Sequence, residues 1–253
     1  MLKNIDINND KLKILYTNKF DQTAESNSYL ALYKNQTKVV KIFKNKDDIE
    51  NKVKKITLLK KRLKNNNSVV CADNFVTKDN EIIGYIMPFI EGENNYSNIL
   101  NKKNYIIYLK EISKLIKDLH ELNIVLADFH SNIITDKNNN LHFIDHDNFA
   151  IDNLTVDKKN IYLKAYEKNI DIFDKNFDYY LLNLYTVAAL KKICLPYIYS
   201  YYQSNPHEFN FKDEEIRNIF FNTMNLNEVY NEELIIDKIQ NVEDIKKLKI
   251  KCF

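Results

Sequence analysis

The stretch ADFHSNIITDKNNNLHFIDHDNF, residues 127–149, places carboxylates and amides at the ends of short apolar runs. After the loop over 124–132, the pattern predicts a short strand (IIT), a turn (KNNN) and a second strand (LHFID). Asp145 ends the second strand, where a carboxylate is costly unless it binds a cation or hydrogen-bond donors. The stretch therefore predicts a small hairpin with candidate functional side chains at its ends.

The polar residues of this stretch suit phosphoryl transfer. Asp128 can orient an attacking hydroxyl and accept its proton, and the side-chain oxygen of Asn132 can ligate Mg²⁺. A Mg²⁺ ion that bridges ATP phosphates would compensate the charge of Asp145. The simpler alternatives are a solvated polar turn for the loop and a strand-ending cap for Asp145. Asp147 is open between a second metal ligand and a turn cap.

Upstream of this stretch, the sequence predicts a small antiparallel sheet with one helix. Apolar or alternating runs separated by polar breaks predict the strands. These strands are expected over 12–17, 28–34, 38–43, 69–76 and 81–90. Apolar residues at helical spacing predict the helix over 47–64, and acidic residues at its start favour the positive end of the helix dipole.

Lys41 lies inside one of these apolar strands, in the run VVKIF over 39–43. A lysine in such a run needs a compensating partner if it is buried. Glu50, on the following helix, is the best candidate for an ion pair that would hold the lysine against a phosphate, with Asp47 and Asp48 as competitors. The alternative is that Lys41 points outward from an exposed strand face and Glu50 is an ordinary surface glutamate.

Downstream of the polar connector over 92–104, the pattern is mainly helical. The clearest helix is expected over 105–122, where apolar residues form one stripe. Residues 178–193 are the most apolar helical segment and are expected to be the most buried. The order of strands, helix, strands and then mainly helices predicts an α+β fold.

This order of features resembles the protein-kinase-like superfamily over roughly residues 12–200. Lys41 resembles the lysine of the third strand that binds ATP phosphates, and Asp128 resembles the catalytic-loop aspartate. Asn132 resembles the metal-binding asparagine, and Asp145 resembles the aspartate of the DFG motif. The resemblance implies that ATP and Mg²⁺ bind this chain.

The resemblance also implies a two-lobed architecture. The N-lobe, residues 1–90, would hold the antiparallel sheet and one helix, and the mainly helical C-lobe, residues 91–253, would hold the catalytic loop and the metal-binding hairpin. The run FDYYLLNL over 177–184 resembles the start of the buried helix whose aspartate, here Asp178, braces the catalytic loop. With its GYIMP and FIDHDNF motifs, the chain is similar to a bacterial group of kinase-like proteins.

The segment EIIGYIMPFIEG, residues 81–92, resembles the last small-lobe strand and the hinge that binds adenine. With Met87 as the gatekeeper, Pro88 can supply its carbonyl oxygen and Ile90 its backbone N–H to the base, so the proline loses nothing that the ligand requires. Val39 and Ile134 would sandwich the adenine between apolar surfaces. Plain core packing of these residues is the alternative.

The chain departs from the family pattern in several places. The loop over 18–27 has no glycine, although a glycine-rich loop lets backbone N–H groups approach phosphates closely. Asn132 follows Asp128 by four residues rather than five. His130, between them, is expected to brace the loop because Mg²⁺ prefers oxygen ligands. The activation segment has no APE-like end, so no peptide-docking platform is evident.

Bulk composition is typical of a globular protein, with 45% hydrophobic residues, 28% charged residues and a net charge of +2. The basic run over 52–64 fits a solvated helix face, so we expect no nucleic-acid or membrane partner. Three widely spaced cysteines and the absence of an apolar N-terminal h-region favour a cytoplasmic location. Oligomeric state is left open.

Three functions fit these observations. The first is a Ser/Thr protein kinase that transfers the γ-phosphate of ATP to a hydroxyl of an unknown protein. The second is a small-molecule kinase of the aminoglycoside or choline phosphotransferase type, although the interval between Glu91 and Asp128 leaves little room for the usual helical insertion. The third is a pseudokinase that serves as a nucleotide-binding or protein-interaction module, which the glycine-free loop and the shortened catalytic loop favour.

Overall fold

The computed structural model of the chain describes residues 2–9, 11–15, 21–22, 26–45, 48–94, 105–127, 132–152, 154, 175–193, 197–209, 211–225 and 233–240. The predicted α+β class is confirmed. The chain is divided into two compact units. The first unit is Met1–Gly92 with Ile134–Asp147, and the second unit is Glu93–Ile133 with Asn148–Phe253. The hairpin that sequence analysis assigned to the C-lobe is therefore a part of the first unit.

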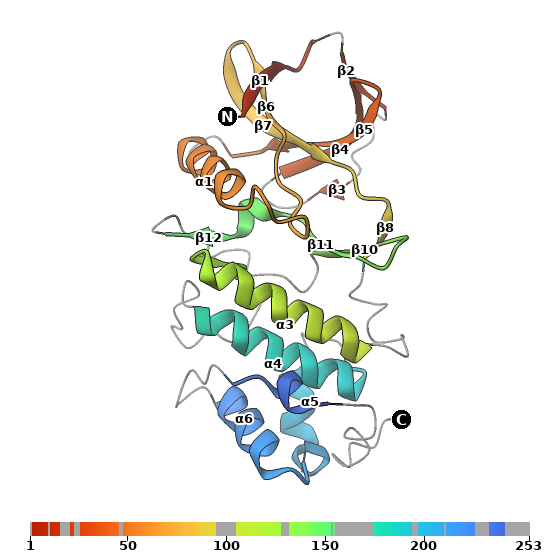
Figure 1. Cartoon of the computed structure of the whole chain (residues 1–253), viewed down its shortest axis with the longest axis vertical. Coiled ribbons are helices and arrows are strands. Elements are labelled where there is room, and N and C mark those ends of the chain that lie inside the picture. Colours follow the sequence, from red (N-terminus) through yellow and green to blue (C-terminus); the bar gives the residue numbers. More distant parts are fainter. Residues whose placement is uncertain are drawn as a thin grey trace. The chain divides into compact units, whose positions relative to one another are not determined.

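The first unit is built on one curled sheet (Figure 1). Its strands run in the order β1-β6-β7-β5-β4-β2, with β3 paired to β4. Their bounds are β1 Lys3–Asp6, β2 Leu12–Ile14, β3 Asp21–Gln22, β4 Ser26–Tyr33, β5 Gln36–Phe43, β6 Asn74–Lys78 and β7 Glu81–Pro88. Lys34 and Asn35 connect β4 to β5, and Asp79 and Asn80 connect β6 to β7, all with positive φ as tight hairpin turns require.

The sheet is mixed, which corrects the prediction of an antiparallel sheet. β1 pairs in parallel with β6, in the register Ile5 to Val76. Ile5 is buried and Ile7 packs against the same apolar cluster, so this short segment alternates as a strand does. Its partner lies far along the chain, and a three-residue alternation does not reveal such a partner.

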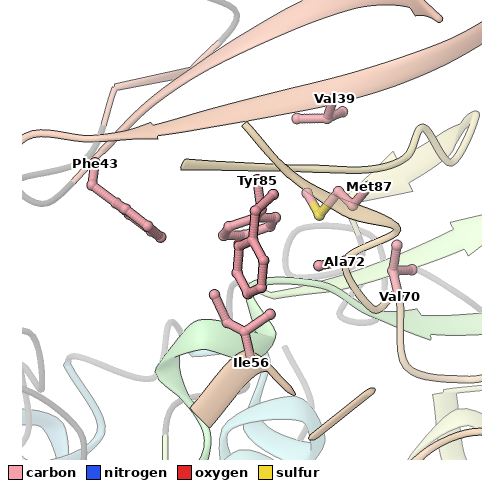
Figure 2. Packing of buried hydrophobic residues seen from close by; sticks show 8 residues of the cluster. Val39, Phe43, Ile56, Val70, Ala72, Tyr85 and Met87 are labelled. Carbon is pink, nitrogen blue, oxygen red and sulfur yellow. The ribbon is translucent and has the colours of Figure 1, made fainter. Parts of the chain in front are cut away.

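One face of this sheet carries the core of the first unit. Side chains alternate along β5, so Val39, Lys41 and Phe43 share a face. Val39 and Phe43 pack there with Tyr85 and Met87 of β7 and with Ile56 of helix α1, Ile49–Arg62 (Figure 2). The helix that was predicted over 47–64 is α1, and its buried Ile56 faces this core.

A small three-stranded sheet holds the predicted hairpin. It runs β11-β10-β8, with bounds β8 Gly92–Asn94, β10 Ile133–Asp136 and β11 Leu141–Phe143. A Cβ atom at Gly92 would lie 2.2 Å from the carbonyl oxygen of Thr135 and 2.7 Å from Cγ2 of Ile134. Only glycine therefore permits this approach of β8 to β10.

The second unit is mainly helical. Helices α3 and α4 pack side by side (Figure 1), and the short antiparallel pair β9–β12 contacts them through β9. The bounds are α3 Tyr105–Glu121, β9 Ile124–Val125, β12 Ala150–Ile151, α4 Lys175–Lys191, α5 Ile198–Ser204, α6 Glu214–Asn225 and α7 Ile235–Lys238. Among the helices described, none is both long and apolar enough to cross a bilayer.

Candidate functional site

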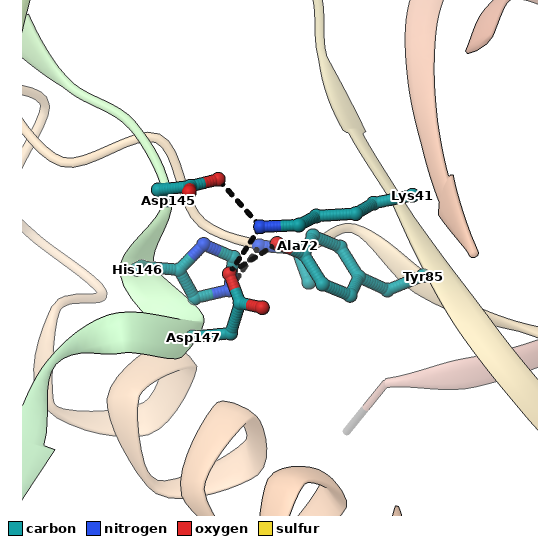
Figure 3. Close-up of polar contacts among 6 residues, drawn as sticks. All are labelled: Lys41, Ala72, Tyr85, Asp145, His146 and Asp147. Carbon is teal, nitrogen blue, oxygen red and sulfur yellow. Dashed lines mark hydrogen bonds and ion pairs between the residues drawn. The ribbon is translucent and has the colours of Figure 1, made fainter. Parts of the chain in front are cut away.

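Lys41 is the centre of a buried polar cluster in the first unit. Its side chain is 3% exposed, and its Nζ atom lies 2.6 Å from Oδ1 of Asp145 and 3.0 Å from Oδ1 of Asp147 (Figure 3). Because Lys41 shares the core-facing side of β5 with Val39 and Phe43, the ammonium enters the protein interior. The alternative of an outward-pointing Lys41 is therefore excluded.

Asp147 receives a second donor from the neighbouring strand. The hydroxyl of Tyr85 donates to Oδ1 of Asp147 at 2.7 Å, and Tyr85 stands opposite Lys41 in the β5–β7 register. Two adjacent strands thus present an ammonium and a hydroxyl to one carboxylate (Figure 3). A Cβ atom at Gly84 would lie 2.0 Å from the carbonyl oxygen of Lys41, so the close approach of the strands here requires glycine.

The turn that carries both aspartates is docked on the segment after α1. Backbone hydrogen bonds join Phe143 to Ser68 at 2.6 Å and to Val70 at 2.8 Å. Asp145 follows with a φ of 63°, a left-handed conformation that aspartate tolerates better than most residues. The amide of Ala72 then donates to Nε2 of His146 at 3.3 Å. These contacts bring residues 145–147 next to the side chain of Lys41.

The charges in this cluster stabilise one another. Burial opposes a charged ammonium, but the carboxylates of Asp147 and Asp145 outweigh it and raise the pKa of Lys41 above its ordinary value. Burial alone would raise the pKa of Asp147, but the charge of Lys41 and the Tyr85 hydroxyl contribute to lowering it below its ordinary range. The ammonium of Lys41 and the carboxylate of Asp147 therefore stabilise each other in the charged form.

His146 lies at the back of the cluster as a neutral base. Burial, together with the charges of Lys41, Lys55 and Lys60, lowers the pKa of His146 to about 4, against the opposing effect of Asp147. Its ring packs edge-on against Tyr85, with the ring centroids 5.1 Å apart. Since Nε2 accepts from the Ala72 amide, the neutral ring carries its proton on Nδ1.

Glu50 does not form the predicted ion pair with Lys41. Its side chain is 84% exposed, and its carboxylate pairs with Lys54 one turn further along α1. The core-facing positions of this helix are taken by apolar residues such as Ile56, so Glu50 falls on the solvent side. The predicted partner on the helix is replaced by the two aspartates of the turn.

The predicted adenine-binding residues lie in the first unit. Val39 and Met87 are buried and stand opposite each other in the β5–β7 register, with Ile90 packed against their cluster. Pro88 is the last residue of β7 and stands opposite Lys38. Ile134 lies against Gly92 in the small sheet. Core packing accounts for Val39 and Met87 in this structure.

A second buried cluster, in the second unit, surrounds Asp178. Its carboxylate accepts hydrogen bonds from the backbone amides of Leu126 at 2.8 Å and Ala127 at 2.9 Å. It also accepts a hydrogen bond from Nε2 of His120 at 2.8 Å. The His120 ring packs edge-on against Tyr179 at 4.9 Å. Asp178 of α4 thereby fixes the backbone immediately before position 128.

The remaining predicted residues are described only in part. Asp128 and His130 lie outside the described residues. Asn132 is described and is half-buried in the second unit. Within the described ranges, no group of three or more His, Cys, Asp or Glu side chains is arranged to hold a metal ion.

Sequence reasoning missed two residues and left a third undecided. No role was predicted for Tyr85 or for His120, yet each donates a hydrogen bond to a buried aspartate. Asp147 was open between a metal ligand and a turn cap, whereas its carboxylate binds Lys41 and Tyr85. The available signal was the pair of a tyrosine and a lysine on adjacent core strands, both in need of a buried partner.

Comparison with protein-family models and with curated proteins gave no match for this chain. Its function is therefore argued from the residues themselves. The two clusters around Lys41 and Asp178 are the features that any function must explain.

Proposed function

We propose that the protein is an ATP-dependent phosphotransferase of the protein-kinase-like fold, with a Ser/Thr protein kinase as the leading form. One observation carries the proposal. Lys41 and Asp145, 104 positions apart in the chain, meet at 2.6 Å within one compact unit. Phosphotransferases of this class need a cation for the ATP phosphates beside a carboxylate for Mg²⁺, and this pair provides both.

Asp145 has the chemistry of a Mg²⁺ ligand. Mg²⁺ typically binds one or two carboxylates together with substrate phosphates, so it needs no all-protein cage. Asp145 offers hard oxygen atoms on a side chain that is 20% exposed. When bound, Mg²⁺ would neutralise phosphate charge. Lys41 would hold the phosphates, and Val39, Met87, Pro88, Ile90 and Ile134 would receive the adenine.

The second unit supplies support for the acceptor side. Asp178 holds the amides of Leu126 and Ala127, and Asp128 follows them directly in the chain. A catalytic aspartate must be positioned within a fraction of an ångström to act as a base, and a buried brace serves that need. We assign Asp128 to orienting the acceptor hydroxyl and accepting its proton.

Transfer of ³²P from γ-labelled ATP tests the proposal. The acceptors should include the protein itself, mixed protein substrates and small hydroxyl compounds, which separate protein kinases from small-molecule kinases. We expect Mg²⁺-dependent labelling that falls about 10²-fold or more in Lys41→Met and in Asp128→Asn. The exposed turn variant Asp79→Asn, another acid-to-amide change, should keep full activity. Labelling that persists in both site variants would contradict the proposal.

One observation favours a second function, a nucleotide-binding module without transfer. The ammonium that would bind phosphate is held by two carboxylates. ATP at 100 times its dissociation constant would stabilise the fold by about 2.7 kcal/mol. Thermal stabilisation by ATP and Mg²⁺ without labelling of any acceptor would favour this module, and stabilisation with labelling would favour the enzyme.

A further inference from the structure

We propose that Asp147, rather than Glu50, is the positioning residue for Lys41. Asp147 is held by Tyr85 and remains the counter-ion of Lys41. It keeps the ammonium in place while Asp145 exchanges Lys41 for water or a cation. The inference deepens the proposed function and rests on it for its catalytic meaning. Its structural part concerns only residues of the first unit. It also decides between the roles that the sequence left open for Asp147.

The two carboxylates that bind Lys41 differ in accessibility. The Asp147 side chain is 2% exposed, whereas that of Asp145 is 20% exposed. A carboxylate with no access to water cannot replace a lost partner with solvent, so removal of Lys41 would leave Asp147 as an uncompensated buried charge. Asp145 can exchange its ion pair with Lys41 for contacts with water or a cation at a much lower cost in free energy. When a ligand binds, Lys41 therefore retains its ion pair with Asp147 and breaks the one with Asp145.

Lysine has the donors for this exchange. An ammonium group carries three N–H bonds and no acceptor. One can remain on Asp147 at 3.0 Å while the donor now on Asp145 at 2.6 Å turns toward phosphate oxygens. Mg²⁺ on Asp145 would favour this step, because it neutralises the carboxylate that competes with the phosphates for Lys41.

Asp147 is poorly suited to bind metal itself. Its Oδ1 atom already accepts from Lys41 and from Tyr85. A divalent cation on the same buried carboxylate would stand beside the Lys41 ammonium, and two cations repel strongly where water is excluded. The Tyr85 hydroxyl instead fixes the orientation of the carboxylate from the adjacent strand.

Glu50 cannot take this role in the observed arrangement. It is exposed and pairs with Lys54 on its own helix. The counter-ion of Lys41 thus comes from the turn after β11, two positions from the proposed metal ligand. Lysine, its counter-ion and the proposed metal ligand all belong to the first unit.

Acetylation of Lys41 tests the inference without any activity. Acetic anhydride modifies a buried lysine only when its side chain leaves its ion pairs and reaches solvent, so the rate measures how firmly Lys41 is held. We expect Asp147→Asn to raise the acetylation rate of Lys41 about 10-fold in nucleotide-free protein, measured by peptide mass spectrometry. Tyr85→Phe should raise it by a smaller factor, and Glu50→Gln should leave it unchanged. The rate at Lys55, also buried in the first unit, serves as an internal control for unfolding.

Equal rates at Lys41 in Asp147→Asn and Glu50→Gln would overturn the inference, even if the protein transfers phosphate. Conversely, the expected pattern in a protein that labels no acceptor would support the counter-ion and reject the proposed enzyme. If labelling is observed, Asp147→Asn should lower kcat with its Mg²⁺ requirement unchanged, whereas Asp145→Asn should raise that requirement. A raised Mg²⁺ requirement in Asp147→Asn would identify a metal ligand and overturn the proposal.

Discussion

Two buried aspartates, Asp147 in the first unit and Asp178 in the second, solve the same physical problem in different ways. Each carboxylate is removed from water and must be compensated. Asp147 is compensated by the ammonium of Lys41 and the hydroxyl of Tyr85. Asp178 is compensated by backbone amides of Leu126 and Ala127 and by an imidazole.

The difference lies in what each partner can do next. Backbone amides have no rotamers, so Asp178 is bound to one arrangement of the chain after β9. The partners of Asp147 are side chains on two strands, and one of them is an ammonium group that carries three N–H donors. The second unit thus holds an aspartate fixed to the backbone, and the first unit holds an aspartate fixed by side chains alone.

Removal of the brace should have the largest effect. Asp178→Ala leaves buried amides and His120 without an acceptor, so we expect a loss of about 3–5 kcal/mol in the free energy of unfolding. Asp178→Asn keeps one acceptor oxygen and should lose less. Urea unfolding at pH 7 measures both. A loss below about 1 kcal/mol in the free energy of unfolding of Asp178→Ala would mean that the Asp178 cluster contributes little to stability.

A pH series should reveal the effect of burying His146 beside the Lys41 cluster of the first unit. His146 has a folded pKa of about 4, below the ordinary value of about 6.5. Between these values the unfolded chain binds the additional proton, so stability falls as pH falls. From pH 7 to pH 5 we expect a loss of about 2 kcal/mol from this residue.

His146→Gln removes that proton and should flatten the loss, because glutamine keeps an acceptor for the Ala72 amide but does not titrate. His207→Gln, at an exposed position, should retain it. The free energy of unfolding at pH 7 and pH 5 gives the comparison. If the free energy of unfolding falls equally between pH 7 and pH 5 in wild type and in His146→Gln, His146 does not cause the loss.

The smallest effect is expected at Glu50. The pair with Lys54 joins two exposed side chains on one helix, and such pairs add little because water and salt screen them. Glu50→Gln should therefore leave the melting temperature unchanged within error at low and high salt. A clear drop would show that Glu50 contributes to the cluster around Lys41 after all.

Elements with strong local periodicity were predicted closely. The helices expected over 47–64 and 105–122 are α1 and α3, displaced by at most two residues at each end. Lys41 was expected to need a buried partner because it interrupts an apolar strand, and its contacts bear out that physical reasoning. Such features depend on neighbours in sequence, which a single chain displays.

Features that depend on long-range pairing were not accessible. β1 is defined by its parallel partner β6, far along the chain. The role of Asp147 depends on the docking of Phe143 between Ser68 and Val70, which no local pattern encodes. Glu50 was predicted because it lies on the helix that follows Lys41, although its pairing with Lys54 four residues later was a local signal for an exposed position.

The chain contains only two glycines, and both are held by backbone contact. Gly84 pins one end of the segment with Met87, Pro88 and Ile90 against β5, and Gly92 pins the other end against β10. A segment fixed at both ends can change its backbone conformation little when a ligand binds. If adenine binds there, the segment should select ligands by a preformed shape, and bulkier purine analogues should bind more weakly.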